Sequence, residues 1–468
     1  MLEITPLLDR TSKEPLFVQL LSYIKKQIQI EKIRPGDKLP SKRKLANHLG
    51  VSLNTVENAY QQLNAEGYVQ SIPREGFFVA DIDEDWFNIR PVKRKEMERK
   101  TSNKKDMYKY DFNHGKVELD QFPYSVWKRL TLESIDKQQK EVFLNGDPKG
   151  EWSLRNEIAN YLFQSRGVKC SPAQIVIGAG TQYLLHLLTM MLDPSYVYAM
   201  EDPGFHRTRR VLEDKGHLIR PIPLNKNGIC IDTLRASDAT ITYVTPSHQF
   251  PTGIIMPIKR RIELLKWANE VNGYIIEDDY DGEFRYKGKP IPSLQGLDNW
   301  DRVIYLGTFS KSLIPSIRVS YMILPEHLLG NYENKLSVYK QTVSKLHQDT
   351  LQKFMKNGHW ETHLNKMRRL YRRKQEVLIS SINEYLKDNF EVIGEQSGLH
   401  ILLSDYRRRS EQNLIQMAKE HSVKVYPTSI YYNAPHKINE HSILIGFGGI
   451  NIENIHEGVR QLSKAWLD

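Results

Sequence analysis

The sequence is poor in cysteine, since its 468 residues include only Cys170 and Cys230. Two cysteines are too few for a disulfide framework or a cysteine-based metal site, and they are compatible with a reducing compartment. Long apolar runs are missing too, because no stretch reaches the roughly 18 residues that a membrane span needs. The start, Met1 to Thr5, lacks the basic and apolar regions of a secretion signal. We therefore expect a soluble, cytoplasmic protein with no membrane partner.

Length and charge leave more than one interpretation open. A chain of this size predicts two or more folding units, and 40% apolar with 26% charged residues is typical of globular proteins. The net charge of +10 indicates either a polyanionic partner, such as nucleic acid, or a solvated surface with a lysine surplus. Only about +3 of it falls in residues 1–80.

A charged segment separates two regions of different character. Residues 81–107 are polar and without helical periodicity, with about −4 in residues 81–85 and about +6 in residues 86–105. This composition predicts a linker between domains at 1–80 and 108–468. Its basic block can contact DNA phosphates, although a solvated tether is the favoured interpretation.

The N-terminal segment has the spacing of three helices and a hairpin. Apolar side chains recur at helical intervals over residues 15–31. Ser41 can cap a second helix that Gly50 ends, and Ser52 can cap a third. Two short helices joined by a glycine turn are typical of a helix-turn-helix, and residues 68–79 predict a hairpin beside it. The alternative is a small helical docking domain whose basic side chains form a solvated face.

This segment resembles the winged helix-turn-helix of GntR-family bacterial regulators. The motifs that carry the resemblance are Leu39-Pro40-Ser41, Gly50-Val51-Ser52, Thr55-Val56 and Glu66-Gly67. The resemblance implies contacts to double-stranded DNA from Ser41, Lys42, Arg43, Ser52, Asn54, Thr55, Arg74 and Gly76. Leu53 and Glu57 stand where the family often has arginine, which weakens phosphate attraction. Leu53 can instead pack against a thymine methyl.

From about residue 108 the chain alternates strand-like apolar runs with helical periods. Such alternation is typical of an α/β fold with a mostly parallel sheet. One apolar strand ends in Gly178-Ala-Gly180-Thr181-Gln182, just before a helix. A turn of this kind directs free amides and the positive end of a helix dipole at a phosphate. Tyr183 stands where a dinucleotide fingerprint has its third glycine, so a single phosphate fits better.

Two further segments place ionisable side chains after apolar strands. Asp278 and Tyr280 are two residues apart, so they share one face of a strand. A hard-metal site from Glu277, Asp278, Asp279 and Asp281 is the less favoured alternative, because successive acids on a strand point to opposite faces. Lys311 follows the next strand among small hydroxyl residues, where a desolvated amine becomes nucleophilic.

Together these segments predict a pocket for pyridoxal phosphate. Lys311 supplies an amine for a Schiff base, Asp278 an anion for the pyridinium nitrogen, and Tyr280 a donor to the phenolic oxygen. The phosphate would be held by Gly180, Thr181, Gln182, Thr308, Ser310 and Arg318.

The order and spacing of these segments resemble the fold type I aminotransferases over residues 108–468. In that family an aromatic after a Glu-x-Pro segment stacks on the cofactor, which implies Phe205 here. A GntR-like winged helix joined to such a domain resembles the MocR, or GabR-like, regulators, with characteristic segments at residues 245–253 and 277–286. The resemblance implies pyridoxal phosphate binding, head-to-tail homodimers, and control of genes of amino-acid or vitamin B6 metabolism.

Several positions depart from the aminotransferase pattern. Leu444 stands where an arginine commonly clamps the substrate carboxylate, and Asn145 replaces a tyrosine that reaches the other subunit's phosphate. Phe250 replaces an asparagine that contacts the cofactor oxygen, and His248 either substitutes for it or is a structural histidine. Arg207 can hold an effector, although at least two of the three arginines in residues 207–210 are expected on a solvent-facing helix.

The favoured function is a DNA-binding transcription regulator that senses pyridoxal phosphate or its adduct with an amine. The missing clamp at Leu444 favours pyridoxal phosphate itself, and hence vitamin B6 control. The alternative is an active aminotransferase with an appended DNA-binding domain.

Overall fold

The computed structural model describes residues 4–82, 108–135, 140–286, 291–433 and 441–467. They belong to two separate units, one within residues 1–103 and the other within residues 104–468. The expected linker, residues 81–107, lies outside the described residues from residue 83 onward. Within the described ranges, every helix is too short or too polar to cross a lipid bilayer.

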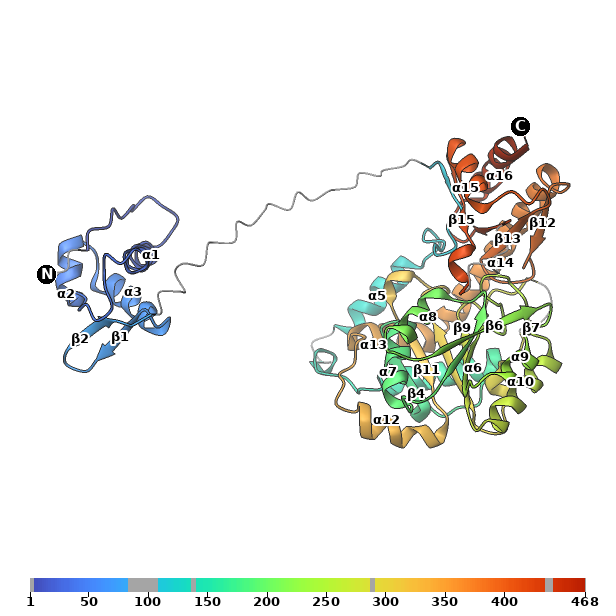
Figure 1. Ribbon diagram of the computed structural model, residues 1–468, viewed down its shortest axis with the longest axis horizontal. Coiled ribbons are helices and arrows are strands. Elements are labelled where there is room, and N and C mark those ends of the chain that lie inside the picture. Colours follow the sequence, from blue (N-terminus) through green and yellow to red (C-terminus); the bar gives the residue numbers. More distant parts are fainter. Residues whose placement is uncertain (1–3, 83–107, 136–139, 287–290, 434–440, 468) are drawn as a thin grey trace. The chain divides into compact units, whose positions relative to one another are not determined.

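The first unit contains three helices and a two-stranded sheet, drawn in blue in Figure 1. Its elements are α1 (Leu16–Gln29), α2 (Lys42–Leu49), α3 (Leu53–Ala65), β1 (Val69–Ile72) and β2 (Gly76–Val79). Ser41 caps α2 by accepting from the Lys44 amide at 3.4 Å, and Gly50 ends it with φ 62°. Ser52 caps α3 through the Thr55 amide at 3.1 Å. These caps and the antiparallel pair β1·β2 confirm the predicted helix-turn-helix and hairpin.

One apolar core holds the three helices together. Leu20 and Ile24 of α1 pack with Val56 and Leu63 of α3, and all four are fully buried. The hydroxyl of Tyr60 donates to the Pro40 carbonyl at 2.9 Å, which ties α3 to the chain just before α2. The core therefore fixes which face of α3 points outward.

The second unit is built on an eight-stranded sheet with the order β4-β11-β10-β9-β8-β5-β6-β7. The strands are β4 (Ile175–Gly178), β5 (Tyr198–Asp202), β6 (Ile219–Asn225), β7 (Gly228–Ile229), β8 (Ile241–Val244), β9 (Tyr274–Asp279), β10 (Val303–Thr308) and β11 (Ser320–Ile323). The pairings from β10 to β6 are parallel, whereas β11 and β7 run antiparallel to their neighbours. The sheet confirms the predicted α/β class with a mostly parallel sheet.

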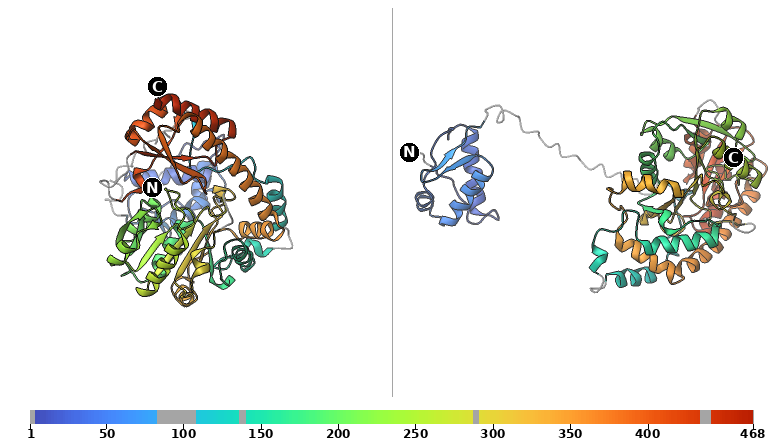
Figure 2. Two further views of the ribbon diagram at one scale, coloured as in Figure 1. Left: turned by 90° about the vertical axis from the view of Figure 1, so that its right-hand side faces the viewer. Right: turned by 90° about the horizontal axis from the view of Figure 1, so that it is seen from below.

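Helices cover both faces of this sheet, as the two views in Figure 2 show. They are α5 (Tyr124–Ser134), α6 (Trp152–Arg166), α7 (Thr181–Met191), α8 (His206–Glu213), α9 (Ile231–Ala236), α10 (Ile258–Glu270), α11 (Leu294–Leu297), α12 (Leu329–Leu336) and α13 (Lys345–Lys356), with 3-10 turns η1 (Lys140–Phe143), η2 (Pro172–Gln174), η3 (Pro315–Ile317) and η4 (Glu326–Leu328). Ile175 and Ile177 pack in one core with α6 and α13, and Val176 packs in another with α7 and α12. Strands buried on both faces are apolar at nearly every position, which is why they were visible as continuous runs in the sequence.

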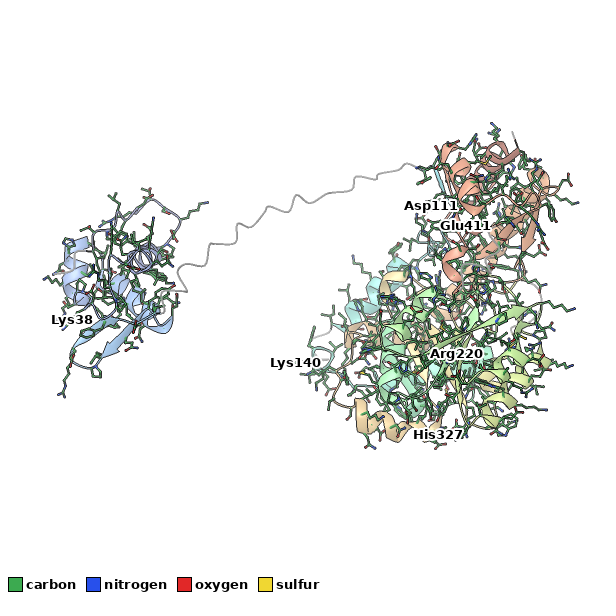
Figure 3. All side chains as sticks on the ribbon, viewed as in Figure 1. Lys38, Asp111, Lys140, Arg220, His327 and Glu411 are labelled. Carbon is green, nitrogen blue, oxygen red and sulfur yellow. The ribbon has the colours of Figure 1, made fainter. Side chains whose placement is uncertain are left out.

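The last part of the chain forms a four-stranded sheet with the order β12-β13-β16-β15, drawn in red in Figure 1. Its elements are α14 (His359–Tyr385), β12 (Phe390–Ile393), β13 (His400–Asp405), α15 (Glu411–Glu420), β14 (Val423–Lys424), β15 (Tyr426–Pro427), η5 (Ser429–Tyr431), β16 (Ser442–Gly446) and α16 (Ile452–Leu467). The short strand β3 (Tyr110–Asp111) pairs with β14. Asp111 and Glu411, which are labelled in Figure 3, both tie this part of the chain together. Asp111 accepts from the Tyr426 hydroxyl at 2.7 Å, and Glu411 accepts from the Thr428 amide at 2.8 Å. These bonds hold residues 112–115 and Tyr431 in place near the strand ends of the larger sheet.

Candidate cofactor cavity and DNA-binding face

The predicted DNA-binding residues lie at the N-terminal ends of α2 and α3 and on the hairpin. The hydroxyls of Ser41 and Ser52 are engaged as helix caps, and Ser52 Oγ lies 2.8 Å from Thr55 Oγ1. Asn54 is exposed on the first turn of α3. Arg74 is exposed at the hairpin turn with φ 66°, and Gly76 follows with φ 120°. A positive φ at Gly76 is readily adopted only by glycine, so this residue shapes the turn that presents Arg74.

Two neighbouring cations of α2 have different surroundings. Lys42 pairs with Glu57 of α3 at 2.5 Å, and its ammonium lies 5.7 Å from the Phe77 ring centroid. Arg43 is exposed and has no ion pair or hydrogen bond with a described residue. The charge of Lys42 is thus compensated inside the protein, whereas that of Arg43 faces outward.

A cavity of about 250 Å³ opens at the carboxyl ends of the parallel strands of the second unit. This end of an open α/β sheet is where such folds bind ligands. The residues of the sequence prediction that line it are Gly180, Thr181, Gln182, Phe205, Arg207, Asp278, Tyr280, Thr308, Ser310, Lys311 and Arg318. His248 is the exception, because it does not line this cavity.

Lys311 is partly buried in the wall of the cavity. Its Nζ donates to the His114 carbonyl at 2.7 Å. The pKa of Lys311 is lowered to about 8, chiefly by burial; the carboxylate of Asp281 opposes this shift and the positive charge of Arg207 adds to it. A sizeable fraction of neutral, nucleophilic amine is therefore present near neutral pH.

Asp278 lines the same cavity as Lys311, and one of its oxygens is unpaired among the described residues. The Tyr243 hydroxyl donates to Oδ2, whereas Oδ1 is buried without a hydrogen-bond partner among the described residues. Burial raises the pKa of Asp278 to about 7, and the Tyr243 hydrogen bond opposes that shift. An unpaired buried carboxylate oxygen is costly unless a donor from a ligand meets it, so Oδ1 fits the protonated ring nitrogen of pyridoxal phosphate.

The part of the cavity lined by the start of α7 can hold a phosphate. α7 begins at Thr181, and the first amides of a helix have no partner inside it. Gly180 has φ 100°, and a Cβ there would collide with the Arg318 guanidinium. Ser310 Oγ is buried without a partner in the described part of the chain, while Thr308 Oγ1 accepts from the Ser310 amide at 3.2 Å. Amides, a hydroxyl and a cation thus converge as a phosphate dianion requires.

His248 lies one layer behind the cavity. It is 2% exposed, and its Nδ1 is 3.0 Å from an Asp281 oxygen and 3.0 Å from the Tyr280 hydroxyl. Of the two interpretations left open for His248, these contacts favour a structural histidine over direct contact with the cofactor oxygen. Tyr280 lines the cavity, and its hydroxyl is held by His248, whose Nδ1 also contacts Asp281.

An apolar cluster occupies the region of the missing arginine clamp. Leu444 is fully buried with Phe250, Leu402 and Tyr431, and Phe205 packs against them. The Phe250 ring centroid is 5.3 Å from that of Phe205 and 4.7 Å from that of Tyr431. Of this cluster, Phe205 and Phe250 line the cavity, whereas Leu444 does not, and all of its side chains are uncharged.

Arg207 is the one arginine of its segment that lines the cavity. Arg209 lies 3.9 Å from Glu213, and Arg210 lies 2.9 Å from Asp214, along the face of α8. Arg210 is 73% exposed, as expected for a solvent-facing helix, whereas Arg209 is only 19% exposed and donates to the Ile430 carbonyl at 3.4 Å. Arg207 makes no ion pair with a described residue.

The ionisable wall residues that sequence reasoning did not assign to the cavity include His114, Asp281 and His400. His114 and His400 come from segments far from the motifs, and no local pattern marked them. Burial lowers the pKa of His114 to about 4, with Lys311 and Arg207 adding to the effect, so its imidazole is neutral.

The four acids considered as a metal site do not converge. Glu277 accepts from the Leu294 amide at 2.8 Å, and Asp279 accepts from Arg166 at 2.7 Å and from the Tyr305 hydroxyl at 2.6 Å. Asp278 faces the cavity instead, as alternation along β9 requires.

Comparison with known proteins agrees with both halves of this description. Residues 17–79 match the gntR family of bacterial regulatory proteins, and residues 109–462 match aminotransferase class I and II. The chain is 46% identical over 465 residues to the uncharacterized HTH-type transcriptional regulator YdeL of Bacillus subtilis, covering 99% of this chain and 100% of that protein.

Two further relatives also match along nearly their whole length. The probable rhizopine catabolism regulatory protein MocR of Rhizobium meliloti is 31% identical, covering 98% of this chain and 95% of that protein. The HTH-type pyridoxine biosynthesis transcriptional regulator PdxR of Corynebacterium glutamicum is 30% identical, and the match covers 96% of this chain and 95% of that protein. The crystal structure of kynurenine aminotransferase from Pyrococcus horikoshii has the same fold, with a TM-score of 0.69 at 22% identity over 82% of this chain and 96% of that one.

The fold and the cavity define a DNA-binding transcription regulator with an aminotransferase-like domain whose cofactor is pyridoxal phosphate. More particularly, the chain belongs to the MocR-type regulators of the GntR family.

Proposed function

We propose that pyridoxal phosphate is the effector of this regulator as well as its cofactor, and that the regulated genes serve vitamin B6 metabolism. The observation that carries the proposal is Leu444, buried in an apolar cluster where aminotransferases commonly place an arginine. A leucine cannot form the bidentate pair that holds a substrate carboxylate. The cavity is therefore better suited to the cofactor alone than to an amino acid. The relative PdxR, named for pyridoxine biosynthesis, supports the same class of genes.

Each predicted wall residue has a role in this proposal. When bound, pyridoxal phosphate supplies an aldehyde that condenses with an amine and a pyridinium ring that withdraws electrons. Lys311 would provide the amine, Asp278 would accept the ring N–H, and Tyr280 would donate to the phenolic oxygen. Phe205 would contact the ring, and the phosphate would be held by Gly180, Thr181, Gln182, Thr308, Ser310 and Arg318.

An active aminotransferase is the second candidate function. It is favoured by the lowered pKa of Lys311, about 8, and by Arg207 in the cavity wall, where it can pair with the carboxylate of an amino acid. Incubation of the purified protein with amino acids and keto acids distinguishes the two. Turnover at ordinary enzymatic rates, of order 1–1000 per second, would contradict a purely regulatory role.

Binding to the DNA upstream of the protein's own gene tests the effector. We expect the affinity of the full-length protein for this DNA to change when pyridoxal phosphate is added, and Lys311→Ala to remove the response. An equal affinity with and without pyridoxal phosphate, together with a response to an amino acid, would transfer the effector role to the amine adduct. The outward-facing cations of the first unit should make the binding itself salt-dependent in all cases.

A further inference from the structure

The predicted recognition helix, α3, has an unusual composition for a helix that binds DNA. α3, residues 53–65, contains no lysine and no arginine, and its only acid is Glu57. Arginine and lysine are the side chains that best match the two acceptors of guanine in the major groove. α3 therefore lacks the usual means of recognising a G·C pair.

Three amide side chains form the outward stripe of α3. The buried side of the helix is made by Val56, Ala59, Tyr60 and Leu63. At 100° per residue, the direction opposite to them is occupied by Asn54, Asn58 and Gln61, all of which are exposed. None of these three amides makes a hydrogen bond to a described residue.

The other amides of α3 are engaged within the protein. Gln62 donates to Glu66 at 2.8 Å, and Asn64 accepts from the Ser71 amide at 3.1 Å. The unpaired amides are thus confined to the stripe that points away from the core.

Glu57 is also engaged within the protein, so its carboxylate is not available to contact a base. A glutamate can accept from the amino group of cytosine, which would allow recognition of a G·C pair. Here the carboxylate of Glu57 pairs with Lys42 at 2.5 Å. The one acid of the helix is therefore used to fix α3 against α2.

An amide side chain matches adenine, because its carbonyl accepts from N6 while its NH₂ donates to N7. Leu53, on the first turn, is 43% exposed and offers an apolar contact for the thymine methyl. Arg74 at the hairpin turn adds an exposed cation, and the narrow minor groove of A-tracts attracts inserted arginine. Each of these side-chain contacts favours A·T pairs over G·C pairs.

We propose that Asn54, Asn58 and Gln61 are specificity-determining residues, and that α3 recognises adenine and thymine in each operator half-site. The proposal deepens the DNA-binding function and rests on it. It identifies the partner as duplex DNA with A·T pairs at the positions that face α3.

Selection from a duplex library with a randomised core tests this directly, using the full-length protein. We expect enrichment of A·T pairs at adjacent positions of each half-site. Enrichment of guanine and cytosine there would overturn the proposal while leaving DNA binding intact. Failure to bind any duplex at low salt would overturn the DNA-binding function, and the proposal with it.

Single substitutions then test whether the outward amides of α3 contact the bases. Asn58→Ala should weaken binding to the selected duplex by roughly 5- to 150-fold and leave binding to an unrelated duplex unchanged. Gln62→Ala is the matched control, since Gln62 lies beside the stripe and is paired with Glu66. Equal losses on both duplexes, or equal effects of the two variants, would exclude base reading by Asn58.

A gain of specificity provides an independent readout. Asn58→Arg introduces the side chain that matches guanine, so selection with this variant should replace one A·T pair by G·C. Stronger binding to every duplex with no change of preferred base would contradict the assignment, because the arginine would then contact only phosphate.

Discussion

At the scale of single residues, the chemistry of the cavity depends on burial more than on charge pairing. Lys311 and Asp278 line one cavity, yet burial moves the pKa of each toward its neutral form, to about 8 and about 7 respectively. A polar ligand that replaces the lost hydration relieves both costs at once. The cavity is therefore arranged to gain stability when its cofactor binds.

The pKa of Lys311 predicts how covalent attachment of pyridoxal phosphate depends on pH. Only the neutral amine attacks the aldehyde, so the attachment rate should rise roughly tenfold per pH unit and level off above about pH 8. Lys311→Ala should abolish the absorbance of the lysine-bound cofactor, whereas Lys169→Ala, an exposed lysine, should not. Stopped-flow absorbance measures the rate. A yellow Lys311→Ala protein would show that another amine holds the cofactor.

Asp278 is expected to account for much of the cofactor affinity. Asp278→Asn removes the negative partner of the pyridinium nitrogen, a charge-assisted hydrogen bond worth about 1.5–3 kcal/mol. We expect the affinity for pyridoxal phosphate to fall roughly 10- to 150-fold, measured by titration of the purified cofactor-free protein. Tyr243→Phe removes only the hydroxyl that supports Asp278, so a smaller loss is expected. A larger loss for Tyr243→Phe than for Asp278→Asn would contradict this ranking.

At the scale of elements, local patterns predicted helix ends and strands well. Ser41, Gly50 and Ser52 act through backbone contacts only a few residues away, so their roles were readable from the sequence. The position of His248 could not be predicted from the sequence, because it depends on contacts with Tyr280 and Asp281, which lie more than 30 residues further along the chain. The Lys42–Glu57 ion pair was not predicted for the same reason, since only the fold brings α2 and α3 together.

The N-terminal end of α2 is expected to contribute a phosphate contact through Arg43. Arg43→Ala should weaken binding to all duplexes alike and reduce the slope of log affinity against log salt by about one, because one fewer counterion is released. Lys26→Ala is the control. Lys26 follows Lys25, which pairs with Glu66 beyond the C-terminal end of α3, away from the predicted groove contacts. An unchanged slope for Arg43→Ala, from binding curves at several salt concentrations, would place Arg43 off the DNA.

The segment around η1 is the place where we expect the homodimer implied by the family resemblance to form. Phe143 and Leu144 are 68% and 65% exposed, and they precede Asn145, the position that reaches the other subunit in related enzymes. Large exposed apolar side chains are typical of interfaces. Leu144→Asp should therefore shift the protein toward monomer in analytical ultracentrifugation. Leu218→Asp, 57% exposed on the stretch before β6, is the matched control and should leave the mass unchanged.

At the scale of the whole molecule, the proposed function requires that cofactor binding in one unit change DNA binding by the other. Such a coupling is a free energy shared by the two ligands, and it is reciprocal by thermodynamic necessity. If pyridoxal phosphate changes the affinity for the upstream DNA by a given factor, that DNA must change the affinity for pyridoxal phosphate by the same factor.

This reciprocity gives the sharpest test of regulation by pyridoxal phosphate. We expect a factor of about 5 to 150, which is the usual range for allosteric coupling. The cofactor is titrated into the cofactor-free protein with and without saturating upstream DNA, and the DNA is titrated with and without saturating cofactor. Asn58→Ala, which weakens DNA binding without touching the cavity, should leave the cofactor affinity of the DNA-free protein unchanged. A cofactor affinity that is the same with and without DNA would mean that pyridoxal phosphate only supports the fold of its own unit, and that a different ligand controls the operator.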